Sequence, residues 1–383
     1  NWLARITAFT VWVDTAIANF RKGVRGGVVL PAALVGKIIP QMESLAQSDS
    51  SKSIFYGPIN RFPEAFSPRE KRRLREAYDA AIQKELIPAY TRLAGFLQNE
   101  YLPKARPTSG LSSLPSGSDM YRYYVYFYTT TRKTPEELYD TGLREVERIT
   151  SEITKIKNAI GFNGSVKELF ESMRTDEKLM PFMTSEQVLK AYDTVRRKIE
   201  PHLEKYFGLK PRSAFEVREV EAFRAASAPA QYRRPSLDGS RPGVFYVPIV
   251  DPTKVSVAPI ESVFIHEAIP GHHYQLSLQQ ENDTLPRFRR LAVVPVFSEG
   301  WALYVESLGE LLGCYGDPYQ KLGALNQEMR RAVRLVVDAA IHTGKMNREQ
   351  AIAYMLAHEA LSEQVATREV ERYMAMPGQA LSY

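Results

Sequence analysis

Proline and glycine interrupt this chain where its histidines are most concentrated. Residues 266–275 read HEAIPGHHYQ and hold three of the chain's six histidines. In a continuous helix Pro270 would lack a backbone donor and clash with the carbonyl of His266, and Gly271 relaxes the backbone. The pattern on either side is helical. We therefore expect a helix that is deformed between His266 and His272, which restricts how the imidazoles can meet.

This deformation decides whether two of the histidines can share a metal ion. Hydrolytic zinc enzymes often carry His-Glu-x-x-His on one helix, where both histidines bind zinc and the glutamate handles protons. On a regular helix His272 would be rotated by roughly 240° from His266, and His273 would lie about 10 Å further along the axis. The sequence resembles His-Glu-x-Gly-His of thimet oligopeptidase-like enzymes. It also resembles the motif of dipeptidyl peptidase III, which has one extra residue before Gly-His, and this chain would add one more. On that alignment His272 is the second ligand, and His273 is the alternative.

A third ligand is expected from FSEGWALYVE, residues 297–306. A catalytic zinc site takes three protein ligands and keeps one position open. Glu299 begins a second helical run, and glutamate-ligand zinc peptidases donate a carboxylate from such a separate downstream helix. The segment is similar to Glu-Gly-x-Ala-x-Tyr of aminopeptidase N-like enzymes. We expect Zn²⁺ to be bound by His266, His272 and Glu299.

The chemistry also needs a base and a donor for a developing oxyanion. Glu267 is the expected general base, and Glu306 is expected to orient a ligand histidine. Candidates for the donor are Tyr304, Tyr373, Tyr383 and His342. Tyr383 is preferred, because the turn-like PGQA between Tyr373 and Tyr383 can bring either ring over the metal. The alternative interpretation of each is a buried ring with a satisfied polar group.

Arginines offer candidate sites for a substrate carboxylate. Arg334, Asp338 and His342 follow one another at four-residue steps on one helix face. Arg334 or Arg241 would bind a substrate carboxylate in a carboxypeptidase or a γ-glutamyl-type hydrolase. The alternative is that Arg334 and Asp338 brace the helix.

Composition excludes several classes of protein. The chain has 383 residues, 44% of them hydrophobic, which suffices for a large core. Its net charge of +6 comes from basic residues that are spread along the chain, which argues against nucleic-acid binding. A single cysteine excludes an intrachain disulfide and a thiolate metal cluster. No apolar run approaches the ~18 to 20 residues of a membrane span.

Helix signals dominate the rest of the sequence and predict a mainly α fold. A hydroxyl residue stands three positions before Glu or Gln at Ser67, Thr134 and Thr184, which predicts three long helices. Residues 103–119 are rich in Pro, Gly and Ser and are expected to form a loop. Residues 120–131 are aromatic and β-branched, and this composition fits either an extended strand or the start of a buried helix. VFYVPIV, residues 244–250, is expected to form a strand, which Pro242 and Pro248 would place at a sheet edge.

Five blocks in order identify a family resemblance. They are RPGVFYV (241–247), HEAIPGHHYQ, EGWALYVESLGE (299–310), RAVRLVVDAAIH (331–342) and RYMAMPGQALSY (372–383). These blocks resemble the bacterial domain-of-unknown-function family 885 over essentially the whole chain. Met346 departs from the pattern, where we expect tryptophan, which puts fine substrate preference in doubt.

The resemblance implies a zincin-like helical metallopeptidase body with a small edge β-sheet next to the active-site helix. The strand at Gly243–Val247, with Tyr246, would pair with substrate backbone in such a body. Tyr304 and Arg241 are further expected substrate contacts. We expect a helical subdomain over residues 1–230 and a metal-binding catalytic subdomain over residues 231–383, forming the C-terminal part of a longer chain.

The expected function is that of a zinc-dependent metallopeptidase acting on short peptides. Family members often carry export or lipoprotein signals, so the resemblance implies an exported protein, and a cytoplasmic location stays open. Two alternatives also stay open: a zinc hydrolase of non-peptide amides or esters, and a metal-free binding or scaffold protein. The oligomeric state is not predicted.

Overall fold

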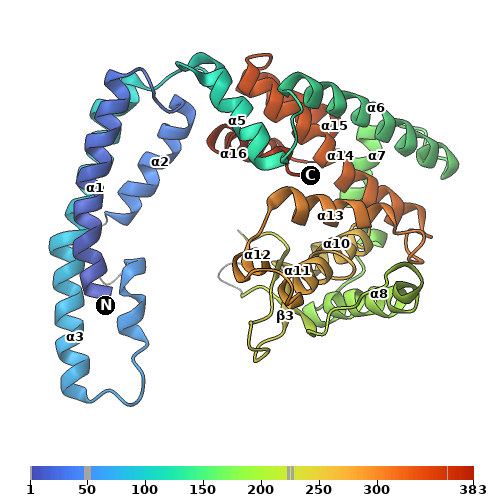
Figure 1. Cartoon of the computed structure of the whole chain (residues 1–383), viewed down its shortest axis with the longest axis horizontal. Helices are drawn as coiled ribbons and strands as arrows, with labels where there is room; N and C mark the ends of the chain where they lie inside the picture. The colour runs from blue at the N-terminus through green and yellow to red at the C-terminus, as the bar shows by residue number, and fades with distance from the viewer. Residues whose placement is uncertain (1, 47–52, 222–224, 226–227, 360) are drawn as a thin grey trace. The chain divides into compact units, whose positions relative to one another are not determined.

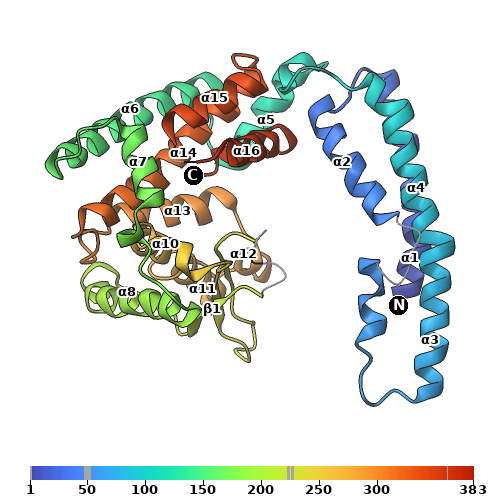
Figure 2. The same cartoon turned by 180° about the vertical axis from the view of Figure 1, so that it is seen from behind.

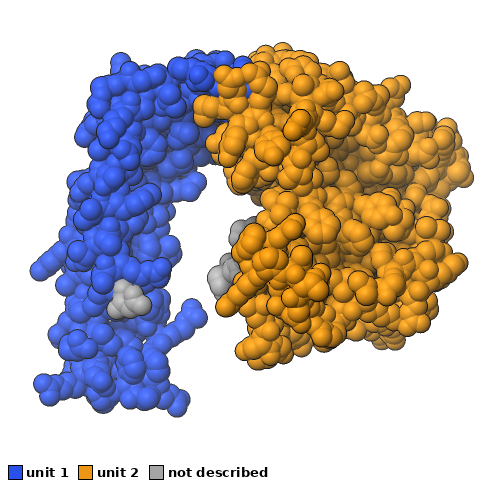
Figure 3. Space-filling view, viewed as in Figure 1, with its two compact units in different colours: residues 1–118 blue, residues 119–383 orange. Residues whose placement is uncertain are grey.

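The chain folds into two compact units, residues 1–118 and 119–383, which Figure 3 distinguishes by colour. The computed structural model describes residues 2–46, 53–221, 225, 228–359 and 361–383. Within these ranges, no helix has the length and apolar character needed to cross a bilayer. The units divide after Ser118, whereas the sequence suggested a boundary between residues 230 and 231, because helices and strands of residues 119–230 pack against the C-terminal half.

The first unit is built from long helices (Figure 1). Its helices are α1 (Trp2–Arg25), α2 (Ala32–Leu45), α3 (Pro68–Ala81) and α4 (Ile87–Phe96), with π-helical turns η3 (Ile82–Leu86) and η4 (Leu97–Tyr101) and 3₁₀ turns η2 (Ile54–Asn60), η5 (Leu102–Lys104) and η6 (Leu111–Ser113). Apolar faces of α1, α2 and α4 form its main core, where Val13, Val35 and Ala89 are fully buried.

The second unit is mainly helical with one small sheet. Its helices are α5 (Gly117–Thr129), α6 (Pro135–Ala159), α7 (Val166–Thr175), α8 (Ser185–Tyr206), α10 (Ile260–Glu267), α11 (His272–Glu281), α12 (Arg287–Leu291), α13 (Pro295–Ser307), α14 (Pro318–Thr343), α15 (Arg348–His358) and α16 (Glu363–Ala375), with 3₁₀ turns η7 (Glu177–Leu179), η8 (Pro252–Lys254) and η9 (Gln379–Leu381). Helix α14 packs along α6 and also contacts α10, as Figures 1 and 2 show. The mainly helical fold predicted from the sequence is confirmed.

The three predicted helix starts are confirmed. The hydroxyls of Ser67 and Thr134 accept hydrogen bonds from the third backbone N–H of α3 and α6, and glutamates complete both capping boxes. Thr184 caps α8 by accepting from the backbone of Gln187. Residues 120–129, which the sequence left open, belong to helix α5.

The sheet has three strands in the order β1 (Phe215–Glu219), β3 (Gly243–Val247), β2 (Gln231–Arg233). Strand β3 pairs with β1 in parallel and with β2 in antiparallel orientation. The prediction that residues 243–247 form an edge strand is therefore wrong. Pro242 and Pro248 lie just outside the paired residues, so they leave both sides of β3 free to bond.

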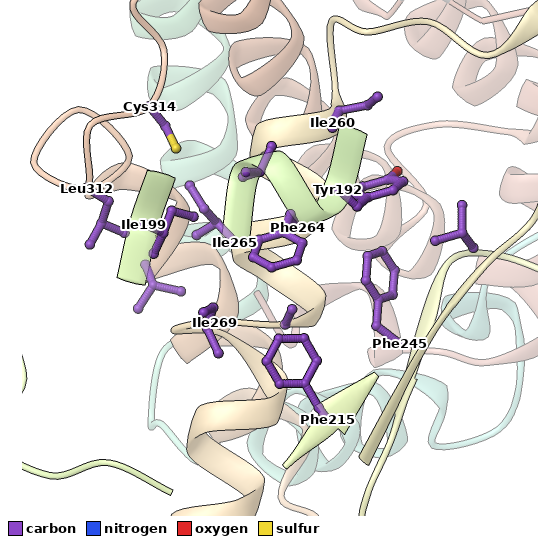
Figure 4. Close-up of a cluster of buried hydrophobic side chains, with 14 of the residues drawn as sticks. Tyr192, Ile199, Phe215, Phe245, Ile260, Phe264, Ile265, Ile269, Leu312 and Cys314 are labelled. Carbon is purple, nitrogen blue, oxygen red and sulfur yellow. The ribbon is translucent and has the colours of Figure 1, made fainter. Parts of the chain in front are cut away.

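The core of the second unit lies between the sheet, α8 and α10 (Figure 4). The ring of Phe264 on α10 packs near Tyr192 of α8 and Phe245 of β3, with ring centroids 6.4 Å away in both cases. All three side chains are buried. Helix α10 is thus fixed on two sides by apolar contacts, and its C-terminal end carries the first residues of the site.

Candidate metal centre

The segment between α10 and α11 breaks the helix as the sequence predicts. Helix α10 ends at Glu267, and Ala268 leaves the helical region with φ −106° and ψ −104°. Gly271 precedes α11, and a Cβ on it would lie 2.0 Å from the carbonyl oxygen of His266. Since real Cβ atoms do not approach an oxygen so closely, only glycine fits here. The Ile269–Pro270 peptide bond is cis.

This break brings two imidazoles and a carboxylate together. The rings of His266 and His272 have centroids 4.7 Å apart and are inclined by 79°. Oε2 of Glu299, on α13, lies 3.6 Å from Nε2 of His266 and 3.8 Å from Nε2 of His272. One ligand atom from each of the three residues lies within 4.8 Å of the other two. The structure therefore groups the three residues predicted as metal ligands.

Both histidines have a partner on the ring nitrogen that faces away from Glu299. Nδ1 of His266 lies 2.6 Å from Oε1 of Glu306. Because a carboxylate only accepts hydrogen bonds, Nδ1 carries the proton and Nε2 can offer a lone pair. Nδ1 of His272 lies 3.2 Å from the hydroxyl of Ser298. The Nδ1 atom of His272 can therefore also carry the proton and leave a lone pair on Nε2. Glu306 stands where the sequence analysis expects a residue that orients a ligand histidine.

The charges of the site are coupled. Although burial opposes the charged form of His266, Glu299 and Glu306 raise its pKa. Burial and the charge of His266 lower the pKa of His272. Burial also opposes ionisation of Glu299, yet the two histidines and Arg331 lower its pKa. The pKa of each of the three groups therefore depends on the charges of the other two, so they titrate together.

Glu267 is a buried carboxylate without a full set of partners. Its side chain follows His266 directly, and its Oε2 makes no hydrogen bond to any residue that the structure describes. Burial raises the pKa of Glu267 to about 7. The negative charges of Glu299 and Glu306 also raise this pKa, whereas the positive charges of His266 and Arg331 lower it. An unpaired buried carboxyl oxygen is costly in a folded protein. Oε2 of Glu267 is thus a buried carboxyl oxygen, next in sequence to His266, that could accept a hydrogen bond from a bound molecule.

His273 lies outside this cluster. Its Nδ1 is 2.7 Å from the hydroxyl of Tyr232 on β2 and 3.3 Å from that of Ser277. Its ring packs on Phe215 of β1, with centroids 4.5 Å apart. Burial lowers the pKa of His273 to about 4. His273 thus fastens α11 to the sheet, and of the two alternatives for the second ligand the structure brings only His272 to His266 and Glu299.

The candidate oxyanion donors near the C-terminus have different surroundings. Tyr373 is buried, donates to Glu369 and accepts from Arg334. His342 is buried, and its Nε2 lies 3.1 Å from the carbonyl oxygen of Tyr373. Tyr383 is half-buried, and its ring lies under the guanidinium groups of Arg331 and Arg334. Arg331 also contacts Glu306, the partner of His266. Among these candidates, Tyr383 is therefore connected to the cluster by the shortest series of contacts, through Arg331 and Glu306.

Arg334 is already satisfied by the protein. It pairs with Glu369 at 3.2 Å, donates to Tyr373 and stacks on Tyr383. Asp338 accepts hydrogen bonds from Tyr121 and from the backbone of Gly378. Arg334 and Asp338 thus each tie α14 to other segments, as the alternative that they brace this helix requires. Glu369 also pairs with Arg372, at 2.9 Å, so this one carboxylate is shared between two guanidinium groups.

The other predicted substrate contacts are not gathered around the cluster. Tyr304 is exposed and lies about 140° around α13 from Glu299. Arg241 bonds within its own loop, to Ser236 and Pro242. A Cβ on Gly243 would lie 2.2 Å from the hydroxyl of Tyr232, so this glycine makes room for Tyr232.

Tyr246 faces the opposite side of β3 from the core residue Phe245 and is partly exposed. It pairs with Arg218 of β1 and Gln231 of β2 across the sheet. The predicted pairing of this strand with a substrate backbone is therefore excluded by the strands on both sides.

Two contacts of the site were not predicted. Arg331 of α14 places Nη2 3.3 Å from Oε1 of Glu306, and Nε1 of Trp301 donates to the carbonyl of Pro270 at 2.8 Å. The sequence places Arg331 three residues from Arg334 on the same helix, but nothing local distinguishes which arginine faces the cluster. Trp301 follows Glu299 by two residues and holds the loop that separates the histidines.

The fold and the site define a mainly helical protein in which two buried histidines and a partly exposed glutamate form a group that could hold a metal ion. The chain belongs to the family of bacterial proteins of unknown function designated DUF885, which matches residues 1–383. The predicted family is therefore confirmed.

Two solved structures are similar to the whole chain. A "putative lipoprotein" from Colwellia psychrerythraea is 28% identical with a TM-score of 0.91, and the match covers 100% of this chain and 67% of that chain. A "putative lipoprotein of unknown function" from Shewanella oneidensis is 21% identical with a TM-score of 0.68, over 100% of this chain and 68% of that chain. No curated protein matches the sequence significantly.

Proposed function

We propose that this protein is a zinc-dependent hydrolase that cleaves amide bonds in short peptides. The donor set supports zinc, because two imidazole nitrogens and one carboxylate are the ligands of many catalytic zinc sites. His266 and His272 are buried, and the Glu299 side chain keeps 27% of its surface exposed. A site with this donor set that is exposed on the side of Glu299 can admit a substrate.

The observation that carries the proposal is the unpaired Oε2 of Glu267 beside these ligands. A bound Zn²⁺ would supply Lewis acidity towards a carbonyl oxygen and lower the pKa of a water molecule. Glu267 Oε2 would accept a proton from the attacking water and pass it to the leaving amine. Glu359 is also buried with one unpaired oxygen, but its other oxygen pairs with Arg330, whereas Glu267 has no ion pair with any residue that the structure describes.

Tyr383 is the proposed hydrogen-bond donor to the oxyanion. Tyr373 and His342 are occupied by other groups, and Tyr304 faces away from Glu299. The ring of Tyr383 is held against Arg331 and Arg334. A phenol fixed in this way would donate a proton in a hydrogen bond without a large reorganisation.

Short peptides are the proposed substrates because the ligands are buried. A scissile bond must reach side chains with 8% and 11% exposure, at His266 and His272. A short extended chain reaches such a site more easily than a folded protein. The 28% identical Colwellia protein is described as a "putative lipoprotein", which supports the expectation of export.

Zinc content and turnover of Glu267→Gln test this function. We expect one zinc per chain in both the native protein and the variant, and turnover of labelled peptides reduced at least 100-fold in the variant. Glu310→Gln is the matched control, because that side chain is 66% exposed and pairs with Lys321. Full activity of Glu267→Gln contradicts the assigned base. A native protein that takes up no zinc contradicts the hydrolase, and cleavage of small amides or esters alone contradicts the peptide substrate.

A further inference from the structure

The ligand histidine His266 is supported by a chain of contacts that continues beyond Glu306. Oε1 of Glu306 lies 2.6 Å from Nδ1 of His266 and 3.3 Å from Nη2 of Arg331. The same Nη2 is 3.4 Å from Nδ1 of His266. Arg331 thus approaches the carboxylate oxygen that holds the imidazole.

Arg331 is itself held in place from two directions. Its Nη1 donates to the backbone oxygen of Gln327 at 2.7 Å and to the Gln327 side chain at 2.9 Å. Tyr383 covers the guanidinium, with Cζ 5.6 Å from the ring centroid. A guanidinium fixed on its own helix and covered by an aromatic ring has little rotational freedom.

The contact is buried, which makes its geometry consequential. The side chains of His266, Glu306 and Arg331 keep 8%, 6% and 11% of their surface exposed. If Glu306 contacted only His266, this buried carboxylate would lack a permanent positive partner. Its orientation would then depend on the histidine alone. Arg331 supplies that charge from α14, so the direction of the imidazole depends on how α14 packs against α10, the helix that carries His266.

We propose that Arg331 is a positioning residue for the metal centre, acting through Glu306 to aim Nε2 of His266 at the position shared with His272 and Glu299. This inference rests on the zinc site of the proposed function, but it concerns metal affinity and not turnover. Groups that hold a ligating histidine from behind affect metal affinity by roughly 10- to 100-fold when removed.

Zinc affinity of the full chain, measured by competition with a chelator, tests the proposal. Arg331→Met should weaken zinc binding by roughly 10- to 100-fold. Arg331→Lys should recover part of the loss, because an ammonium group can still meet Glu306. Arg330→Gln is the matched control: Arg330 precedes Arg331 on α14 but pairs with Glu359, at 3.1 Å.

The visible spectrum of the Co²⁺-loaded protein provides a second readout. We expect it to change in Arg331→Met and to stay unchanged in Arg330→Gln, because loss of stability alone does not alter coordination. Native zinc affinity and spectrum in Arg331→Met overturn the proposal, as does an equal loss of affinity in Arg330→Gln. A native protein that binds no zinc overturns both this inference and the proposed function. Zinc binding that depends on Arg331, without hydrolysis of any peptide or amide, supports this inference and overturns only the hydrolase.

Discussion

Glu299 and Glu306 approach opposite nitrogens of the same imidazole. They lie seven residues apart on α13, which places them within about 20° of each other on one helix face and about 10.5 Å apart along the axis. Glu299 lies near Nε2 of His266 and Glu306 near Nδ1. In the proposed zinc site, one helix therefore provides both a ligand and the group that directs another ligand.

The two glutamates should differ in their effect on metal binding. Glu299→Ala removes a donor and should abolish stoichiometric zinc binding. Glu306→Gln keeps the size of the side chain and should weaken affinity by roughly 10- to 100-fold. Mass spectrometry of the dialysed proteins and chelator competition measure both effects. A larger loss in Glu306→Gln than in Glu299→Ala would reverse the assigned roles.

The adjacent histidines should separate metal binding from stability. His272→Ala should release zinc. His273→Ala should retain zinc and lower the free energy of unfolding by about 1 to 3 kcal/mol, because the part-buried hydroxyl of Tyr232 loses its bond to the imidazole and Phe215 loses its ring contact. Metal analysis and denaturant unfolding of both variants provide the check. Zinc release by His273→Ala alone would show that the ligand assignment is off by one position.

Gly271 should be intolerant of any side chain. A Cβ there would lie 2.0 Å and 2.2 Å from the carbonyl oxygens of His266 and Ile265. Gly271→Ala should therefore destabilise the protein by more than about 2 kcal/mol and impair zinc binding. The control is Gly300→Ala on α13, where a Cβ has no neighbour within 4 Å and should be neutral or stabilise by roughly 0.5 to 1 kcal/mol. Equal thermal stability of the two variants would refute the steric explanation.

Asp338 should make the second unit less stable as the pH rises. This carboxyl is fully buried against Tyr121 and Gly378, and burial raises its pKa to about 7, although the hydrogen bonds and Arg372 act against the shift. In the unfolded chain an aspartate titrates near about 3.9. Between these values the folded state retains a proton that the unfolded state has lost. The contribution of Asp338 is therefore complete below about pH 4 and disappears as the pH passes about 7.

Asp338→Asn removes this titration. We expect the fall in unfolding free energy between pH 4 and pH 7 to be smaller in the variant, with a difference on the order of 4 kcal/mol at most, at roughly 1.4 kcal/mol per pKa unit. Denaturant unfolding at a series of pH values measures the difference between the two proteins. Parallel pH profiles would show that folded Asp338 holds no extra proton between pH 4 and pH 7, which contradicts the prediction.

Local chemistry made much of the helical fold predictable. The capping residues Ser67 and Thr134 act within three residues of a helix start, and Pro270 and Gly271 act on their own backbone. Such signals can be read without knowing which segments meet. The choice of His272 as the partner of His266 could also be made from the local sequence, because it rests on the spacing of these residues around Pro270 and Gly271.

Features that depend on distant segments were not predictable in this way. The position of residues 243–247 in the middle of the sheet depends on β1 and β2, which approach from either side. The separate placement of His273 depends on Tyr232 and Phe215. The identity of the arginine that meets Glu306 depends on how α14 docks, which the helical period alone does not determine.

The broken connection between α10 and α11 changes what sets the spacing of the metal donors. In a His-Glu-x-x-His helix that spacing follows from the pitch and is the same in every protein that uses the motif. Here it is set by the four residues Ala268 to Gly271, with Trp301 holding the carbonyl of Pro270. Sequence changes confined to this short loop can widen or narrow the distance between the imidazoles, and so alter which ions fit, while both helices keep their packing.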